Sequence, residues 1–209
     1  MIIAIAGKAG SGKTYYANKC CTDKDVVISF DGYHYSKNRL KELIEQNIIP
    51  YDALSRRGSP WTYDLERFYR EIKNLKMKRT NKDENLNKDE DLYFPFFDHT
   101  IGDPIENYIC VNLNTINNIY IEGLYVLNDD LFYNIENSNI TDFYDKAIYL
   151  NIEESIIERR LINRHMESFK IDEKTAYNRY INNDKLNSNY IVPKTYFNIK
   201  VIEITGIDY

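Results

Sequence analysis

The loop that follows the first apolar stretch constrains this chain more than any other feature. The stretch Met1–Ala6 is apolar and rich in isoleucine, and it ends in the run Gly7, Lys8, Ala9, Gly10, Ser11, Gly12, Lys13 and Thr14. A glycine, four residues and then Gly-Lys-Thr is the pattern of a phosphate-binding loop between a strand and a helix. Its glycines let successive backbone N–H groups turn toward phosphate oxygens, and the next helix directs its positive end at the same anion. The sequence therefore predicts that residues 7–14 bind a nucleoside triphosphate.

Two side chains of this loop have an expected chemistry. Lys13 would neutralise the β- and γ-phosphates, and the Thr14 hydroxyl would hold Mg²⁺. The plain alternative is a glycine-rich turn that binds nothing. The context disfavours this alternative, because the loop follows a buried-type strand and precedes a helical stretch.

Composition argues against several classes of protein. With 209 residues, 43% of them hydrophobic and 28% charged, the chain is expected to form one domain, residues 1–209, with a sizeable core. A net charge of −5 argues against nucleic acid or an anionic membrane as the main partner, although a small phosphorylated ligand is compatible with it. The three cysteines lack disulfide or metal-ligand spacing, and no signal-peptide pattern or membrane-length apolar run is present. We therefore expect a cytoplasmic protein with no nucleic-acid or membrane partner, and a homodimer is left open.

Short apolar runs alternate with helical patterns along the chain. This alternation predicts a three-layer α/β fold, a parallel sheet with helices on both faces. The expected strands are 1–6, 26–30, 119–123, 146–152 and 199–205, and the expected helices are 15–21, 36–48, 64–77, 153–169 and 172–186.

A side lobe is expected to interrupt this alternation after the second strand, over residues 33–113. It would contain a hairpin of two short strands, 92–97 and 105–113. The polar, charged stretch 78–91 is interpreted as a solvated loop between hairpin strands. Ligands of parallel sheets bind at the carboxyl ends of the strands, so residues at those ends are the candidates for a site.

Two carboxylates stand at such ends. Asp31 follows the second strand, and Glu122 closes the apolar run that starts at Ile119. Asp31 could accept the proton of an acceptor hydroxyl or bind Mg²⁺ through water, and Glu122 would be the second carboxylate beside Mg²⁺. The alternatives are an aspartate that only opens a turn and a strand-end glutamate in solvent.

Arg160 and Arg164 lie four positions apart, so they share one face of a helix. Two like charges repel there unless an anion lies between them, and a transferring phosphoryl group is such an anion. We therefore predict that the two arginines close over the phosphate as a lid. The alternative is a solvated basic face that pairs with Glu158 or Glu167.

Two histidines and one loop are candidates for binding the phosphoryl acceptor. His34 and His99 each follow an aspartate near the end of a predicted strand. Residues 56–64 place two arginines and the single tryptophan, Trp61, in one turn, which could grip an anionic or ring-bearing acceptor. The alternatives are structural histidines and a packing loop with Trp61 in the core.

These stretches resemble, in the same order and over nearly the whole chain, the uridine kinase, phosphoribulokinase and pantothenate kinase group of P-loop kinases. Residues 30–35 resemble the acceptor-side aspartate motif of that group, and residues 57–64 and 95–104 are similar to a branch that includes a fungal ATP-dependent kinase. Further matches to that branch are its Mg²⁺-side strand at 121–127, its lid at 160–165 and its late helical motif at Asn183, Asp184 and Asn187.

The resemblance implies a kinase that uses ATP and Mg²⁺ to phosphorylate a hydroxyl of a small metabolite such as a nucleoside, a sugar or a pantothenate-like compound. By position, Asp31 would be the general base, Thr14 and Glu122 would lie beside Mg²⁺, and Arg160 and Arg164 would form the lid. The lobe 33–113 would then lie on the acceptor side. The acceptor would contact Tyr33, His34, Arg57, Trp61, Asp98 and His99.

A hypothesis from a different class is an ATPase or GTPase switch that acts on a protein partner. A GTPase should carry an Asn-Lys-x-Asp guanine motif, and the nearest strings, residues 81–84 and 87–90, end in glutamate instead. A third hypothesis is a nucleotide-binding scaffold without turnover. It is disfavoured because Lys13, Thr14, Asp31 and Glu122 are all present.

Overall fold

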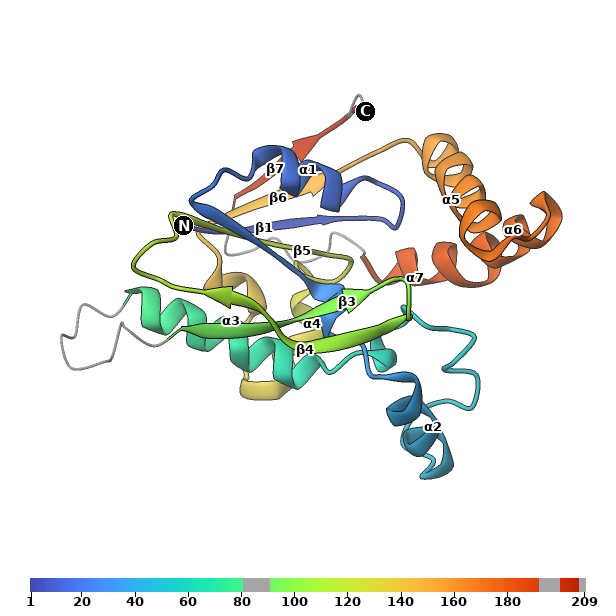
Figure 1. Cartoon of the computed structure of the whole chain (residues 1–209), viewed down its shortest axis with the longest axis horizontal. Helices are drawn as coiled ribbons and strands as arrows, with labels where there is room; N and C mark the ends of the chain where they lie inside the picture. Colours follow the sequence, from blue (N-terminus) through green and yellow to red (C-terminus); the bar gives the residue numbers. More distant parts are fainter. Residues whose placement is uncertain (81–90, 192–199, 207–209) are drawn as a thin grey trace.

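The central sheet carries the phosphate loop on its middle strand. The computed structural model describes residues 1–80, 91–191 and 200–206. Its five-stranded sheet has the order β2-β5-β1-β6-β7, and every neighbouring pair is parallel. Figure 1 shows the two outer helical layers around it. The strands are β1 (Ile2–Gly7), β2 (Asp25–Ser29), β5 (Asn118–Gly123), β6 (Lys146–Leu150) and β7 (Val201–Ile204).

Alternating side chains of β1 divide the core between the two faces of the sheet. Ile3 and Ile5 pack with one cluster, which includes residues of α1 (Lys13–Cys20) and α5 (Glu154–Phe169). Ile2, Ala4 and Ala6 pack with the other cluster, which includes residues of the helices α3 (Leu65–Thr80) and α4 (Asp129–Glu136). Both sides of β1 are therefore buried, as a central parallel strand requires, and the predicted three-layer α/β fold is confirmed.

A two-stranded antiparallel hairpin, β3 (Leu92–Asp98) and β4 (Asp103–Val111), lies on the same side of the sheet as α3 (Figure 1). Its turn, residues 99–102, is close to the helix α2 (Lys37–Glu45), because the backbone N–H of Lys37 donates to Asp103 Oδ1 at 2.9 Å. The predicted hairpin is therefore present. The limits of the acceptor-side lobe, 33–113, stay a prediction.

Two predicted helix starts are confirmed by their capping bonds. Ser36 Oγ accepts from the backbone N–H of Arg39 at 3.1 Å, and Asp64 Oδ1 accepts from that of Arg67 at 3.0 Å. Side-chain oxygens at this position satisfy N–H groups that have no partner within the helix.

Several boundaries differ from the prediction. The second strand ends at Ser29, and residues Phe30–Tyr33 form a 3₁₀ turn in which the Ser29 hydroxyl accepts from the Asp31 N–H. Helix α3 continues to Thr80, so residues 78–80 are helical and the polar stretch follows a helix rather than a hairpin strand. The rest of that predicted loop, residues 81–90, lies outside the described residues, and so do the two stretches that were compared with the guanine motif. Position 199 of the last predicted strand also lies outside them.

The C-terminal helical region is the largest departure. The single helix expected over 172–186 is divided into α6 (Glu173–Arg179), a π-helical turn (Tyr180–Asp184) and α7 (Lys185–Ser188). Helix α4 was not predicted at all. Within the described ranges, none of the helices has the length and apolar character needed to cross a membrane.

Candidate nucleotide and acceptor site

The phosphate loop has the backbone that its glycines were expected to provide. Gly10 and Gly12 have φ angles of 76° and 87°, in the left-handed region that other residues rarely adopt. Gly12 is the N-cap of α1, and no side chain accepts from the first N–H groups of this helix. Those amides and the positive end of the helix are thus left for an anion.

Lys13 is held beneath this loop with only 8% of its surface exposed. Its ammonium donates to the carbonyl oxygen of Lys8 at 3.0 Å. Burial lowers the pKa of Lys13, whereas the nearby carboxylates of Glu122 and Asp31 act in the opposite direction. A buried cation at the phosphate loop is suited to neutralise the negative charge of a triphosphate.

Glu122 lies beside the loop because β5 runs next to β1. The Cα atoms of Glu122 and Ile5 are paired in this register, and the Glu122 side chain is 3% exposed. Thr14 Oγ1 donates to Glu122 Oε1 at 3.2 Å. Burial raises the pKa of Glu122, and Asp31 raises it further, while Lys13 lowers it.

These oxygens fit a bound Mg²⁺. A hard divalent cation prefers carboxylate and hydroxyl oxygens together with phosphate and water, and a cation near the buried Glu122 would relieve the cost of having the Asp31 carboxylate close to it. Thr14 and Glu122 are thus the residues that would hold it. Across residues 1–80, 91–191 and 200–206 we find no group of three or more His, Cys, Asp or Glu side chains that could hold a metal ion. A site completed by phosphate and water is consistent with that finding.

Asp31 opens into the same cavity as the phosphate loop. This cavity has a volume of about 540 Å³ and is lined by Ala9, Gly10, Gly12, Lys13, Thr14, Tyr15, Asp31, His99, Glu122, Leu124, Arg160, Leu161 and Arg164. The Tyr63 hydroxyl donates to Asp31 Oδ1 at 3.3 Å. Burial raises the pKa of Tyr63 well above its ordinary value, so this hydroxyl stays protonated and can act as a donor to the carboxylate.

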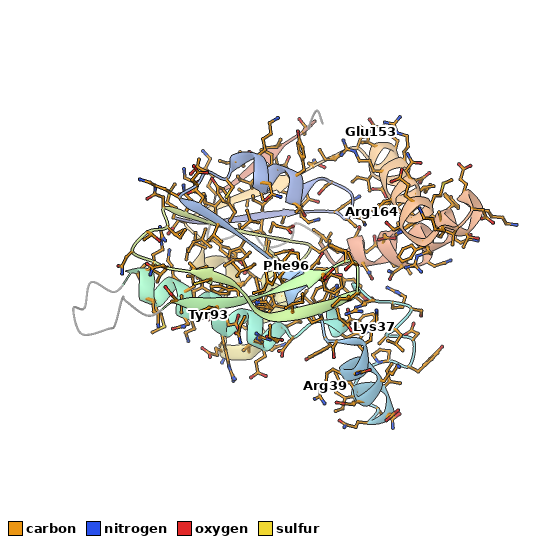
Figure 2. The ribbon with its side chains drawn as sticks, viewed as in Figure 1. Lys37, Arg39, Tyr93, Phe96, Glu153 and Arg164 are labelled. Atoms are coloured by element: carbon orange, nitrogen blue, oxygen red, sulfur yellow. The ribbon has the colours of Figure 1, made fainter. Side chains whose placement is uncertain are left out.

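The two arginines of α5 also line this cavity. Arg160 Nη1 donates to the carbonyl oxygen of Gly10 at 3.4 Å. Figure 2 shows Arg164 farther along α5, on the part of the helix nearer α7, and Glu153 where the helix begins. Guanidinium groups at this place can stabilise negative charge that develops on a phosphoryl group. The helix spacing thus brings both predicted arginines to the cavity that the phosphate loop lines.

Of the six predicted acceptor residues, His99 is the one that lines this cavity. It lies on the exposed turn between β3 and β4. Asp98, next to it, accepts from the Thr100 backbone N–H at 2.8 Å and from the Thr100 hydroxyl at 2.6 Å. Asp98 therefore shapes the turn rather than facing the cavity.

The other four predicted acceptor residues have partners within the protein, and their contact with an acceptor stays a prediction. Tyr33 is 1% exposed and donates to Glu71, and the His34 ring stacks on Tyr63 with ring centroids 3.8 Å apart. The Arg57 guanidinium donates to the carbonyl oxygens of Gly102 and Tyr35, at 2.6 and 2.9 Å, and to Asp103 Oδ1 at 3.0 Å. Trp61 packs edge-on against Tyr190 and lines a separate groove.

Sequence reasoning missed four residues of the site. Tyr15, Leu124 and Leu161 line the cavity, and Tyr63 contacts Asp31. Tyr15 directly follows Thr14, and Leu124 lies within the 121–127 stretch that resembles the Mg²⁺-side strand, so the sequence carried a usable signal for both. Tyr63 reaches Asp31 through an isolated antiparallel bridge between His34 and Tyr63, which has no local sequence signature.

Comparison with solved structures identifies the class of protein to which this fold belongs. The crystal structure of YFH7 from Saccharomyces cerevisiae, described as "a putative P-loop containing kinase with a circular permutation", superposes with a TM-score of 0.80 at 17% identity, over 99% of this chain and 93% of that one. Together with the phosphate loop and its helix, this likeness identifies the fold as that of a P-loop kinase.

Sequence comparison identifies the family. No protein-family model matches the chain. A Schizosaccharomyces pombe protein named "Putative uridine kinase C227.14" is 32% identical over 201 residues, which cover 91% of this chain and 77% of that protein. The ATP-dependent kinase-like protein notR' of Aspergillus versicolor is 29% identical over 164 residues, 78% of this chain and 86% of that protein. The chain belongs to this family of uridine kinase-like, ATP-dependent P-loop kinases.

Proposed function

We propose that this kinase transfers the γ-phosphoryl group of ATP to a hydroxyl of a small metabolite, with Asp31 as the general base. Asp31 accepts the proton of the acceptor hydroxyl, and the oxygen of that hydroxyl forms a bond to the γ-phosphorus. The bond between that phosphorus and the β–γ bridging oxygen breaks, and ADP leaves. Metabolites of the nucleoside, sugar or pantothenate-like classes are the proposed acceptors.

The other cavity residues have roles that follow from their charge and position. The phosphate loop and Lys13 bind the triphosphate, and Arg160 and Arg164 stabilise the charge on the transferring group. Mg²⁺, held beside Thr14 and Glu122, would neutralise charge on the phosphates when bound. Residues 33–113 would supply the acceptor side.

The observation that carries the proposal is the position of Asp31. Its carboxylate lines the same cavity as Lys13, Thr14 and the two arginines of α5. A general base must lie within reach of the acceptor hydroxyl, and that hydroxyl must lie next to the γ-phosphate. One cavity lined by all of these groups supports the proposal on both counts.

The test is incubation of the full chain with Mg²⁺, γ-labelled ATP and a panel that contains uridine and other nucleosides, sugars, pantothenate and a metabolite extract. The proposal predicts label transfer to one class of acceptor, abolished in Lys13→Ala. If ATP were hydrolysed slowly without transfer to any acceptor, and a protein fraction stimulated that hydrolysis, the hypothesis of an ATPase or GTPase switch would be favoured. A comparison of ATP and GTP affinity separates a kinase from a GTPase directly.

A further inference from the structure

A π-helical turn, residues Tyr180–Asp184, lies between α6 and α7 and belongs to none of the cavity walls described above. Such turns hold one extra residue per turn, are rare, and frequently occur at functional sites. The polar side chains of this turn contact two separate parts of the molecule. Together these contacts form a continuous series of bonded residues that begins and ends at residues lining the nucleotide cavity.

The first contact joins the π turn to α5. His165 Nε2 and Asp184 Oδ2 are 2.8 Å apart, and both side chains are nearly buried. His165 directly follows Arg164, which lines the cavity. Any shift of α5 that moves Arg164 toward a phosphate must therefore either carry Asp184 with it or break this contact.

The second contact joins the π turn to the loop that contains Arg56 and Arg57. Asn183 Nδ2 donates to the carbonyl oxygen of Arg57 at 3.0 Å, and its Oδ1 accepts from Arg56 Nε at 3.4 Å. Asn187, which is 3% exposed, accepts from Arg56 Nη2 at 3.0 Å and from Ser59 Oγ at 2.8 Å. A buried polar network in which each of these amide groups has a partner holds one arrangement.

The close fit of this loop leaves little freedom at Gly58. Its φ angle is 99°, and a Cβ atom at this position would lie 3.0 Å from Asn187 Nδ2. The loop backbone therefore lies directly against the network.

The third step leads back to the cavity. The Arg57 guanidinium donates to Gly102 and Asp103, at the end of the β3–β4 turn that carries His99. Lys37, labelled in Figure 2 where α2 begins, supports the same turn through its ammonium, which donates to the carbonyl oxygen of Ile101 at 2.6 Å. His99 itself lines the cavity. The path thus joins Arg164 on the nucleotide side to His99 on the hairpin side.

We propose that Asn183 and Arg57 are positioning residues for the kinase reaction, linked through the π turn so that nucleotide binding at α5 sets the position of the turn that carries His99. The inference rests on the proposed function, because it needs a nucleotide in the cavity. It gives the π turn a role that simple packing would not require, namely thermodynamic coupling between the two sides of the site.

The chain contains a natural reporter of this coupling. Trp61 is its single tryptophan, and the Arg56 guanidinium lies 5.7 Å from the centroid of its ring. Trp61 does not line the nucleotide cavity, so a change in its emission reports a change in the 56–61 loop rather than direct contact with nucleotide.

The experiment titrates the full chain with Mg²⁺ and a non-hydrolysable ATP analogue, and follows Trp61 emission and the heat of binding in parallel. In the unaltered protein we expect binding to change the emission. In Asn183→Ala the analogue should bind within about twofold of the original affinity, while the emission change falls by about fivefold or more. Asn182→Ala is the matched control, because Asn182 is an exposed residue of the same type in the same turn. It should keep the full response.

A second pair of variants tests the contact with α5. Asp184→Ala should behave like Asn183→Ala, whereas Asp184→Asn, which retains an acceptor for His165, should keep most of the response. Binding heat without an emission change in the unaltered protein, or an undiminished change in Asn183→Ala and Asp184→Ala, would overturn the inference alone. If the analogue gave no binding heat, the proposed function would fail and this inference would fail with it.

Discussion

Thr14 and Glu122 are separated by 108 positions in the chain, and the Thr14 hydroxyl donates to Glu122 Oε1 at 3.2 Å. The parallel pairing of β1 and β5 creates this contact, because it aligns the end of one strand with the start of the phosphate loop on the other. The hydroxyl and the buried carboxylate therefore form a preassembled set of oxygens next to the place of the phosphates. This relationship makes the first prediction specific.

Replacing Glu122 with glutamine should weaken the use of Mg²⁺. Glutamine keeps the shape and an acceptor for Thr14 but removes the negative charge, so the Mg²⁺ concentration for half-maximal phosphoryl transfer should rise about tenfold or more. The measurement is a Mg²⁺ titration at saturating ATP. Glu66→Gln, an exposed glutamate on α3, is the control. An unchanged Mg²⁺ dependence in Glu122→Gln would place the metal elsewhere.

Arg160→Ala should slow the chemical step. Arg160 lines the cavity and contacts the carbonyl oxygen of Gly10, so its loss removes a positive charge that would lie beside the phosphoryl group during transfer. We expect kcat to fall on the order of 100-fold, as for other preorganised donors. Arg159→Ala removes an exposed arginine from the next position of the same helix and should leave kcat unchanged. Equal decreases of kcat in the two variants would mean that the reaction depends on the overall charge of α5 rather than on the Arg160 side chain.

Stability should fall as the pH falls from about 6.5 to about 4, partly because of His34. Burial lowers the pKa of this residue from about 6.5 to about 4; Arg57 acts in the same direction, and Asp31 opposes it. Between these values the unfolded chain binds the proton and the folded protein does not, so stability rises with pH across the window. The contribution of His34 to the free energy of unfolding is fully present above about pH 6.5 and amounts to about 3 kcal/mol at most.

The corresponding measurement is urea unfolding at several pH values in the unaltered protein and in His34→Phe. Phenylalanine keeps a ring to stack on Tyr63 but cannot bind a proton, so the free energy of unfolding should depend less on pH between about 4 and 6.5. His99→Gln is the control, because the His99 side chain is exposed. An identical pH dependence in His34→Phe and the unaltered protein would show that His34 does not carry the effect.

Much of the sheet could be predicted from sequence because its signals are local. The isoleucine-rich first strand, the glycine pattern after it and the helix caps Ser36 and Asp64 each act through neighbouring residues. Positions at strand ends can also be predicted in a parallel sheet, and both candidates chosen this way, Asp31 and Glu122, line the cavity. The arginine pair followed from helix periodicity alone.

The missed features depend on contacts between distant segments. The π turn has no local pattern, and its side chains bond to a loop more than 120 positions away, as in Asn183 with Arg57. Helix α4 is only eight residues long, too short for a clear helical period. Arg57 and Trp61 were assigned to the acceptor by residue type, but their partners lie in the hairpin turn and at Tyr190. Residue type alone does not give such partners, and contact of Arg57 and Trp61 with an acceptor stays a prediction.

The most direct test of the account compares Asp31→Asn with the unaltered protein in two assays, calorimetric binding of an ATP analogue and label transfer to the acceptor. The account predicts nucleotide affinity within about twofold and a loss of transfer of about 100-fold or more, because asparagine cannot accept the proton of the acceptor hydroxyl. Transfer at the original rate in Asp31→Asn would contradict the central claim that Asp31 is the general base of this kinase.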